Sequence, residues 1–284
     1  MPGPPTSVHE LRALLEKRGL RPKKSLGQNF LIAADVLQAI AQAADIQPDE
    51  VVVEVGPGVG TLTRWLALAA RRVVAVEVDA NMVAILRETL AAFENVTLIH
   101  ADILKLDLDA ALALSAPYKV VANLPYYITS AIIRKFLDRP HRPSLLVLMM
   151  QDEVAQRILA APGEMSLLAA SVQFYARPSR VMRLPAGAFY PAPQVDSALI
   201  RLDVQTGPLA VSPERFFRVA QAGFGQRRKT LRNALASGLG IGREQSEALL
   251  TQAGIDPQRR AQTLAIAEWV RLAEAWDGPL ADSR

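Results

Sequence analysis

The sequence predicts an α/β fold, a doubly wound, Rossmann-like sheet followed by a smaller domain made only of helices. Short β-branched runs alternate with helix-length amphipathic stretches over residues 51–204, which is the pattern of strands joined by covering helices. One run, at 145–150, is apolar on both faces, as an inner parallel strand is. Residues 213–276 contain helical patterns and no convincing strand. We therefore predict one domain over residues 1–206 and a second over residues 207–284.

Each element is placed by its residue pattern and by the turn residues that bound it. The first five β-rich runs are predicted to form strands at 51–55, 73–78, 96–99, 119–122 and 145–150. Helices are predicted after the first two strands, at 61–70 and 80–93. Two later runs, at 179–183 and 198–204, are expected to pair antiparallel and close the sheet edge. In the second domain, glycine and proline breaks separate predicted helices at 215–223, 243–253 and 260–275.

The composition is that of a globular protein with few options for metal or redox chemistry. Hydrophobic residues make up 50% of the 284 positions, so a sizeable core can form. There is no cysteine, which excludes disulfides, thiolate zinc sites and thiol nucleophiles, and the three histidines are scattered, so no metal site is expected. No apolar run approaches the ~20 residues of a membrane-spanning helix, and the start of the chain lacks the apolar region of a secretory signal. We expect a cytoplasmic protein without a membrane partner.

Basic residues are concentrated in two segments, although the formal net charge is only +4. The first segment contains one acid, Glu16, and six basic residues, namely Arg12, Lys17, Arg18, Arg21, Lys23 and Lys24. The second segment contains no acid and six basic residues, namely Arg215, Arg218, Arg227, Arg228, Lys229 and Arg232. Local excesses of this kind suit a partner with a phosphate backbone, and they are equally typical of solvated helix faces.

Acidic residues stand at the ends of successive predicted strands. The first strand runs into a glycine turn with the spacing GxGxG, which contains Gly56 and leads into a helix whose N–H groups can point at a ligand. Glu77, about 20 positions on, is suited to accept hydrogen bonds from both hydroxyls of a ribose, and Asp102 is suited to accept one from an adenine amino group. Each carboxylate alone can equally be solvated, and Asp79 can be a helix N-cap. Together these features resemble class I S-adenosylmethionine-dependent methyltransferases more than nicotinamide enzymes, whose fingerprint is GxGxxG.

The fourth predicted strand runs into the tetrapeptide Asn123-Leu124-Pro125-Tyr126. It resembles the Asp/Asn/Ser-Pro-Pro-aromatic signature of methyltransferases that act on nucleobase amino groups, although in isolation it is also an ordinary turn after a strand. An adenine N6 lone pair is delocalised into the ring, so N6 is a poor nucleophile toward a sulfonium methyl group. The Asn123 side-chain oxygen and the Leu124 carbonyl can each accept one N6–H, which favours a tetrahedral nitrogen whose lone pair points at the methyl group. Pro125 rigidifies the turn, and Tyr126 offers an aromatic face to the base, worth about 1–3 kcal/mol.

Phe189 is a candidate for a second aromatic wall of the base pocket. It begins the segment Phe189-Tyr190-Pro191-Ala192-Pro193-Gln194-Val195-Asp196-Ser197. A base in a duplex or stacked loop must be extruded before such a pocket can hold it, and a second ring would cover its other face. A proline-rich aromatic loop before a strand is also typical of core packing. We expect catalysis by positioning and electrostatics, because the methylated amine can lose its proton to water without a strong general base.

From residue 20 to about residue 275, the chain resembles the ribosomal RNA adenine dimethyltransferase family. Besides the segments above, the resemblance covers Lys24-Ser25-Leu26-Gly27-Gln28-Asn29-Phe30-Leu31 and the basic segment Phe224-Gly225-Gln226-Arg227-Arg228-Lys229-Thr230-Leu231-Arg232-Asn233. It implies that S-adenosylmethionine is the cofactor. The residues that it implies for the cofactor site are Asn29, Leu31, Gly56, Glu77, Asp102 and Asn123. The resemblance also implies that the helical domain binds structured RNA.

Within this family, the forms Leu-Gly-Gln-Asn-Phe-Leu and Val-Asp-Ser resemble the bacterial small-subunit (16S) enzymes. This implies N6,N6-dimethylation of two adjacent adenosines in the 3′-terminal hairpin loop of 16S rRNA, with four cofactor molecules in all, on the immature small subunit. Three alternatives stay open: a large-subunit (23S) methyltransferase of the resistance type, a DNA adenine methyltransferase, and a ribosome-assembly factor that acts mainly by binding. The departures from the family pattern at Val55, Ala192 and Gln194 leave the pocket residues in place. No pattern resembles a dimer seam, so a monomer is expected.

Overall fold

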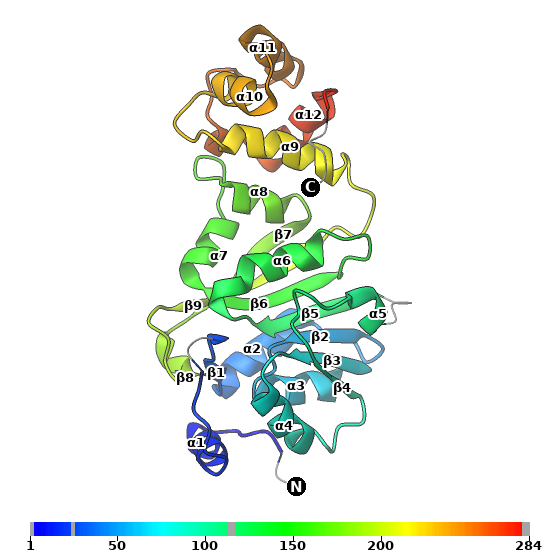
Figure 1. The fold of residues 1–284 in the computed structure, drawn as a ribbon, viewed down its shortest axis with the longest axis vertical. Coiled ribbons are helices and arrows are strands. Elements are labelled where there is room, and N and C mark those ends of the chain that lie inside the picture. Colours follow the sequence, from blue (N-terminus) through cyan, green and yellow to red (C-terminus); the bar gives the residue numbers. More distant parts are fainter. Residues whose placement is uncertain (1–2, 24–25, 113–116, 280–284) are drawn as a thin grey trace. The chain divides into compact units, whose positions relative to one another are not determined.

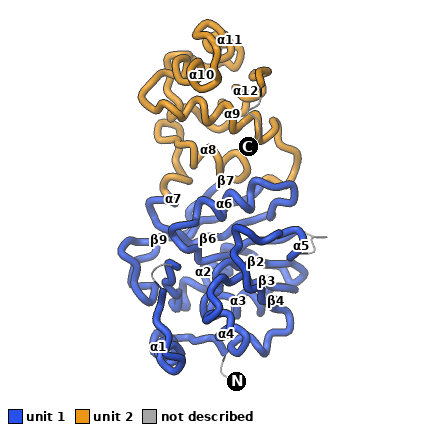
Figure 2. Tube along the Cα trace, viewed as in Figure 1, with its two compact units in different colours: residues 1–155, 178–204 blue, residues 156–177, 205–284 orange. Residues whose placement is uncertain are grey.

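The computed structural model describes residues 3–23, 26–112 and 117–279, and the chain divides into two compact units (Figure 2). The first unit comprises Met1–Ala155 and Pro178–Val204, and the second comprises Gln156–Arg177 and Gln205–Arg284. The second unit therefore takes a segment from the middle of the chain, which a single boundary after residue 206 assigns to the first domain. The physical reason is aromatic packing, because the ring of Phe174 stacks on that of Phe216 with a centroid distance of 3.9 Å.

The first unit is built on a seven-stranded sheet with the order β4-β3-β2-β5-β6-β9-β7 (Figure 1). Its strands in chain order are β2 (Val51–Val55), β3 (Arg72–Glu77), β4 (Val96–His100), β5 (Tyr118–Asn123), β6 (Leu145–Gln151), β7 (Ala176–Leu184) and β9 (Ser197–Val204). The pairs among the first five strands of this order are parallel, while β9 runs antiparallel to β6. The predicted α/β class is confirmed, and each predicted strand overlaps an observed one.

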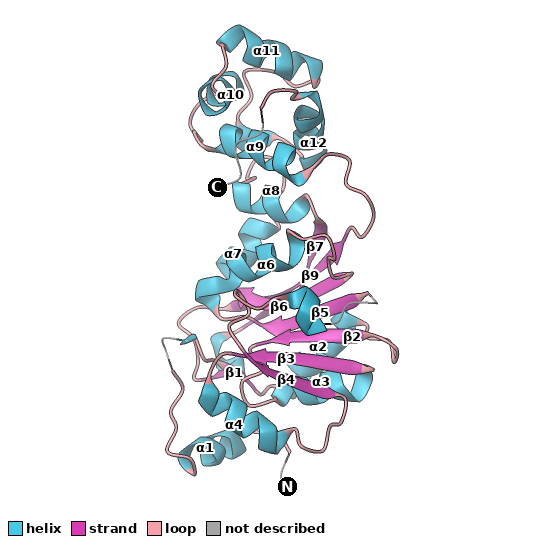
Figure 3. Cartoon of the chain, turned by 45° about the vertical axis from the view of Figure 1, so that its right-hand side comes forward, coloured by secondary structure: helices cyan, strands magenta, loops and turns pink. Residues whose placement is uncertain are grey.

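The direction of chain progression reverses between β2 and β5, and this reversal decides where a ligand can bind. From β2 the chain moves through α3 (Thr61–Ala69) to β3 and through α4 (Ala80–Thr89) to β4, whereas α6 (Thr129–Leu137) leads from β5 to β6 in the opposite direction. Because crossovers between parallel strands are right-handed, α3 and α6 lie on opposite faces of the sheet (Figure 3). The carboxyl ends of β2 and β5 therefore border a crevice at the switch point.

One face of the sheet is covered by α2 (Ala34–Ala44) and α3. Apolar side chains of these helices, such as Ile40 and Leu66, pack in one cluster with strand residues such as Val52 and Val121. All five residues of β2 are buried, as expected of a central strand covered on both faces. The remaining helices in the middle of the chain are α5 (Leu108–Leu112) and α7 (Asp152–Ile158).

The N-terminal segment is joined to the rest of the first unit by a contact between distant parts of the chain. After α1 (Val8–Glu16), the short β1 (Phe30–Leu31) pairs antiparallel with β8 (Phe189–Tyr190). Leu31 lies opposite Phe189 in this pair. Sequence patterns did not predict the two-stranded sheet, because a run of two residues carries no periodicity. The pairing places the segment before β1 beside the loop that leads to β9.

The second unit contains the C-terminal helices. They are α8 (Leu167–Gln173), α9 (Pro213–Phe224), α10 (Leu231–Leu239), α11 (Arg243–Gln252) and α12 (Ile266–Ala275). The helix predicted at 260–275 begins later than expected, because Arg259 donates hydrogen bonds to the carbonyl of Thr263 (2.6 Å) and to the carboxylate of Glu268 (2.5 Å). This clamp holds a 3-10 turn (Ala261–Thr263) ahead of α12.

Within the part of the chain that the structure describes, no helix is both long enough and apolar enough to cross a membrane. The same residues contain no group of three or more His, Cys, Asp or Glu side chains placed to hold a metal ion.

Candidate active site

A cavity lies at the carboxyl ends of β2, β3, β4 and β5, at the switch point of the sheet. The N-terminal segment around β1 completes its wall. The lining brings together eight of the nine residues that the sequence predicts to be functional, namely Asn29, Leu31, Gly56, Glu77, Asp102, Asn123, Leu124 and Tyr126. The ninth, Phe189, is not part of the lining. Segments that are far apart in the sequence therefore converge on one site within the first unit.

The glycine turn after β2 uses left-handed backbone that glycine adopts at little cost. Gly56 has a φ of 68° and Gly58 a φ of 60°. A Cβ on Gly58 would stand 3.0 Å from two ring carbons of Phe30, so the turn also packs tightly against the N-terminal segment. With no side chains on these two residues, a ligand can approach the backbone closely.

Glu77, the last residue of β3, is a buried hydrogen-bond acceptor. It is 6% exposed, and its carboxylate accepts hydrogen bonds from the backbone N–H groups of Gly58 (3.2 Å), Val78 (2.9 Å) and Asp79 (2.8 Å). Burial raises the pKa of Glu77 above its ordinary value, and the three hydrogen bonds oppose that rise because they stabilise the ionised form. The backbone thus holds the Glu77 carboxylate in one orientation at the cavity wall.

The other two carboxylates after β3 and β4 have different surroundings. Asp102 lines the cavity half-buried, and its Oδ1 accepts a hydrogen bond from the N–H of Leu104 at 2.9 Å. Asp79 is not part of the lining, and it caps α4 by accepting a hydrogen bond from the N–H of Asn81 at 3.0 Å. The N-cap alternative for Asp79 is therefore confirmed.

Gln28 also lines the cavity, although no sequence pattern marks it as functional. Its side-chain amide donates to Oδ2 of Asp79 at 2.9 Å, and Nζ of Lys23 lies 2.8 Å from Oδ1 of the same carboxylate. These contacts fasten the N-terminal segment to the start of α4. The family resemblance of Leu-Gly-Gln-Asn-Phe-Leu was the one available signal, and the preceding Lys24 and Ser25 lie outside the described residues.

The side-chain amide of Asn123 is oriented by the N-terminal segment. Asn123 ends β5, and its Nδ2 donates a hydrogen bond to the backbone carbonyl of Asn29 at 2.9 Å. An amide has one acceptor oxygen and one donor nitrogen, so this bond leaves Oδ1 to accept from a donor in the cavity. The adjoining Leu124 is buried, and its N–H donates to the carbonyl of Met149 on β6 at 3.1 Å. These two residues of the tetrapeptide, Asn123 and Leu124, are thus held by backbone carbonyls of other segments.

Tyr126 lines the cavity and is tethered at its hydroxyl. The Oη atom lies 2.6 Å from Oγ of Ser197, the fully buried first residue of β9. Burial raises the pKa of Tyr126, and the hydrogen bond to Ser197 opposes the rise, so the phenol is neutral near pH 7. The contact joins residues 71 positions apart, and no sequence pattern indicates it. The tether restricts the ring, which reduces the entropy that is lost when the ring meets a ligand.

Phe189 lies in the core of the first unit. It is 5% exposed and belongs to the apolar cluster that contains Leu31 and the α2 and α3 side chains. Its backbone pairs with that of Leu31 through the β1–β8 contact. Phe189 is therefore a core residue, which is one of the two roles that its sequence pattern allowed. It lies behind the cavity wall that Asn29 and Leu31 form.

The two basic segments of the sequence have different surroundings in the structure. In the first, Arg18 pairs with Glu88, Lys23 pairs with Asp79, and the guanidinium of Arg12 stacks over the ring of Tyr190 at 4.7 Å. Arg12, Arg18 and Lys23 therefore interact with other residues of the protein.

The middle of the second basic segment, in the second unit, is exposed. Arg227, Arg228 and Lys229 form the turn between α9 and α10, and among the described residues no carboxylate lies within ion-pair distance of them. By contrast, Arg232 pairs with Glu247 at 3.0 Å. The three turn residues are therefore the part of the segment that can meet a polyanion.

A doubly wound sheet, acidic residues at successive strand ends and a nucleobase-amino signature after β5 define a Rossmann-like, S-adenosylmethionine-dependent methyltransferase. Comparison with known proteins narrows this class. The chain belongs to the family described as ribosomal RNA adenine dimethylase, whose family model matches residues 19–277. S-adenosylmethionine is the methyl donor of this family.

The relatives cover nearly the whole chain. Ribosomal RNA small subunit methyltransferase A of Dehalococcoides mccartyi is 48% identical over 272 residues, which cover 95% of this chain and 94% of that protein. The solved structure of 23S rRNA methyltransferase ErmE matches with a TM-score of 0.72 and 30% identity, covering 88% of this chain and all of that one. A dimethyladenosine transferase from Plasmodium falciparum has the same fold, with a TM-score of 0.74 and 21% identity over 86% of this chain and 95% of that one.

The cavity residues fit a sulfonium cofactor by their charge and hydrogen-bonding capacity. The described lining contains three carboxyl groups, those of Glu54, Glu77 and Asp102, and no Lys, Arg or His. Such a lining suits a ligand that carries a net positive charge. Glu54 adds to the predicted set: it is 1% exposed, and its Oε2 has no hydrogen-bond partner among the described residues.

Proposed function

We propose that this protein dimethylates N6 of two adjacent adenosines in the 3′-terminal hairpin loop of 16S rRNA, late in assembly of the small ribosomal subunit. The substrate assignment rests on identity. The relative named for the small subunit is 48% identical to this chain, whereas the 23S enzyme of known structure is 30% identical. These values favour the small subunit over the large-subunit resistance type.

The observation that carries the proposal is the hydrogen bond from Asn123 Nδ2 to the carbonyl of Asn29 at 2.9 Å. It supports a role for Asn123 Oδ1 as the acceptor of one adenine N6–H, with the Leu124 carbonyl as the acceptor of the other. Two acceptors draw the amino group out of the plane of the ring, and the nitrogen lone pair becomes available. Because the acceptors are held before the base arrives, little reorganisation is needed during the reaction.

The remaining cavity residues have roles in binding. The cofactor supplies the electrophilic methyl group. Glu77 is suited to accept hydrogen bonds from its ribose hydroxyls and Asp102 from its adenine amino group, while Gly56 lets it approach the backbone. We assign Asn29 and Leu31 to the same site, because both lie in the cavity wall.

The base pocket begins at Tyr126, whose ring is restrained by Ser197 and can stack on an extruded adenine. Phe189 supports this pocket from the core, by holding the strand that contains Leu31. No strong general base is required, because the methylated amine can release its proton to water. Rate enhancement then comes from orientation and from the dipoles around N6.

The RNA-binding surface is proposed to include Arg227, Arg228 and Lys229. Changing all three to Glu should weaken RNA binding and reduce the slope of log affinity against log salt by about 2, since each phosphate contact with single-stranded RNA contributes about 0.7. The affinity for S-adenosylmethionine should stay the same. A single change at the exposed Arg243 of α11 is the matched control for surface charge. Unaltered RNA affinity in the triple variant would show that the turn is only a solvated helix start.

We also propose that the protein acts as a monomer in the cytoplasm, on immature small subunits. Sedimentation of the purified protein tests this point, and a stable dimer would contradict it.

Labelled S-adenosylmethionine, incubated with the protein and with unmodified small subunits, large subunits or duplex DNA, tests the function. We expect label in small subunits alone, in N6,N6-dimethyladenosine near the 3′ end of the 16S rRNA. Transfer to large subunits or to DNA instead would support the alternative enzymes and overturn the proposal. Tight binding to immature small subunits without transfer would indicate an assembly factor and would equally overturn it.

A further inference from the structure

Glu54 is a buried carboxyl group in the cavity wall with no role in the function proposed above. It is the fourth residue of β2 and lines the same cavity as Asn123. It is 1% exposed, and its Oε2 has no hydrogen-bond partner among the described residues. An ionised carboxylate is costly to bury without donors or an opposite charge. The protonation state of Glu54 therefore depends on what occupies the cavity.

Glu54 differs from the other two carboxyl groups of the lining. Glu77 accepts hydrogen bonds from three backbone N–H groups, and Asp102 accepts one from Leu104. Both carboxyl groups therefore have backbone donors that favour the ionised form. Glu54 has an unpartnered oxygen, and no cationic side chain is present in the described lining to compensate a charge there.

The groups around Glu54 favour its neutral form in the ligand-free protein. Burial raises the pKa of Glu54 to about 8, and the negative charge of Glu77 on the neighbouring β3 adds to the rise. Asp102 after β4 is the third carboxyl group of the cavity, and Tyr126 after β5 is neutral. From α3, the hydroxyl group of Thr63 opposes this rise, because it can donate to the ionised carboxylate, while Thr61 lines the cavity and carries no charge.

We propose that Glu54 distinguishes the cationic cofactor from its neutral product by losing a proton only when the cofactor is bound; this inference rests on the proposed use of the cavity as the cofactor site. The positive charge of S-adenosylmethionine stabilises the carboxylate, so the Glu54 O–H bond breaks and the proton goes to solvent. S-adenosylhomocysteine has a thioether in place of the sulfonium and therefore carries one positive charge fewer. With that product in the cavity, Glu54 takes a proton back from solvent.

This exchange of one proton has a measurable consequence for affinity. Because cofactor binding releases a proton at pH values below the Glu54 pKa of about 8, affinity for S-adenosylmethionine must rise with pH in that range, by up to about tenfold per pH unit. Affinity for S-adenosylhomocysteine lacks this contribution from Glu54. The protein thereby holds the methyl donor more tightly than the spent product, although both share the adenosine that Glu77 and Asp102 are proposed to bind.

The test is isothermal titration calorimetry of the full-length protein, without RNA, at pH 7 in buffers of different ionisation enthalpy. We expect release of close to one proton from Glu54 on binding S-adenosylmethionine and little release on binding S-adenosylhomocysteine. In Glu54→Gln this release should disappear, and the ratio of the two affinities should shrink by about tenfold. The ligand's own ammonium group contributes equally in both proteins, so the difference between them reports on Glu54.

Glu77→Gln is the matched control, because it removes another carboxyl group from the same cavity. It should weaken both ligands by a similar factor and keep most of the proton release, because burial, the largest cause of the raised Glu54 pKa, is unchanged. If Glu54→Gln fails to fold, Glu54→Asp keeps the carboxyl group and is expected to keep the release. Equal proton release and an equal affinity ratio in wild type and Glu54→Gln would overturn the inference, as would loss of release in Glu77→Gln alone. Failure of the wild type to bind either ligand would instead overturn the assignment of the cofactor site.

Discussion

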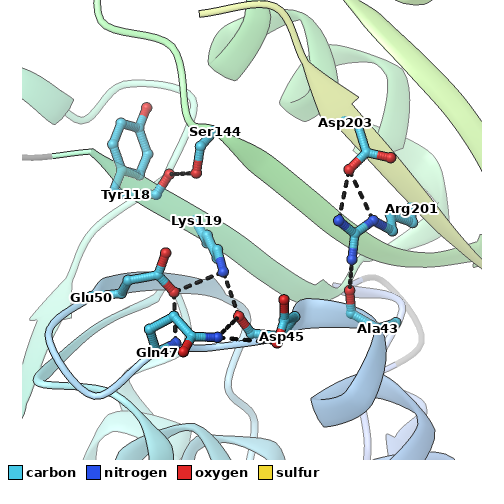
Figure 4. Close-up of polar contacts among 9 residues, drawn as sticks. All are labelled: Ala43, Asp45, Gln47, Glu50, Tyr118, Lys119, Ser144, Arg201 and Asp203. Carbon is cyan, nitrogen blue, oxygen red and sulfur yellow. Dashed lines mark hydrogen bonds and ion pairs between the residues drawn. The ribbon is translucent and has the colours of Figure 1, made fainter.

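The two edges of the parallel sheet differ in whether their charged side chains have partners of opposite charge, although the same strands form both edges. At the amino edge, Lys119 of β5 is 8% exposed, and its Nζ lies 2.7 Å from Oε2 of Glu50 and 2.6 Å from the carbonyl of Asp45 (Figure 4). Nearby, Arg201 donates to Oδ1 of Asp203 at 2.7 Å. Each of these cations thus has an acidic partner.

At the carboxyl edge, β2 and β5 carry polar side chains that have no cationic partner among the described residues of the cavity lining. β2 carries Glu54, with an unpartnered oxygen, and β5 ends in Asn123, whose amide is oriented toward a neighbouring carbonyl. The described lining of the cavity has no basic side chain. A paired charge contributes to holding the fold, whereas an uncompensated carboxyl group destabilises the ligand-free protein and becomes favourable when a cation binds. This difference indicates that the amino edge contributes to stability, whereas the carboxyl edge is suited to bind a cationic ligand.

The largest expected effect is that of Glu54, at the carboxyl edge, on the pH dependence of the free energy of unfolding. In the unfolded chain its carboxyl ionises near pH 4.5, and in the folded protein burial raises its pKa to about 8. Stability is therefore unaffected below pH 4.5 and falls as pH rises to 8, by about 1.4 kcal/mol per pH unit, on the order of 5 kcal/mol in total. Glu54→Gln removes this loss, so the variant should be more stable than wild type at pH 8. Urea unfolding at pH 5 and pH 8 measures it, and parallel pH profiles would contradict the comparison.

Asn123→Ala should give the next largest effect, on turnover. Loss of one preorganised acceptor is expected to lower methyl transfer by about 10²–10³-fold while cofactor binding is partly retained. Asn29→Ala is the comparison variant, because the backbone carbonyl of Asn29 holds Asn123 and survives the substitution. That variant should affect KM for the cofactor more than kcat. Unchanged methyl incorporation in Asn123→Ala would remove the proposed role of the tetrapeptide.

Lys119→Met tests the contribution of the amino edge of the sheet to stability. Glu50 then loses its cation, and because its side chain is 25% exposed, solvent limits the loss of stability to about 2 kcal/mol. Chemical denaturation measures this, with Glu50→Gln as the matched change on the other side of the pair. The affinity for S-adenosylmethionine should stay within about twofold, since the pair lies at the opposite edge of the sheet. A large loss of cofactor affinity would show that the two edges are not independent.

The smallest expected effect concerns the tether of Tyr126. Ser197→Ala and Tyr126→Phe each delete one half of the same hydrogen bond, so each should cost about 1 kcal/mol in methyl transfer. The double variant should cost no more than either single change, because nothing further remains to be lost. Additive losses measured in kcat/KM would indicate that the two hydroxyls act separately.

The sequence by itself determined the features that depend on residues close together in the chain. Strand periodicity, the glycine turn with Gly56, the acidic ends at Glu77 and Asp102, and the tetrapeptide at Asn123 are each local patterns. A parallel sheet then brings the carboxyl ends of its strands to one edge, so their convergence follows from the predicted fold class. Resemblance to a family added Asn29 and Leu31, which no periodicity marks.

Only the tertiary structure decided what depends on contacts between distant residues. The bond from Asn123 to Asn29 spans 94 positions and that from Tyr126 to Ser197 spans 71, and local patterns carry no record of such pairs. The same reason explains why Phe189 lies in the core, why residues 156–177 belong with the C-terminal helices, and why Arg12, Arg18 and Lys23 are engaged within the protein. The neutrality of Glu54 is also a tertiary property, because burial and the absence of a partner cation are set by every segment that surrounds it.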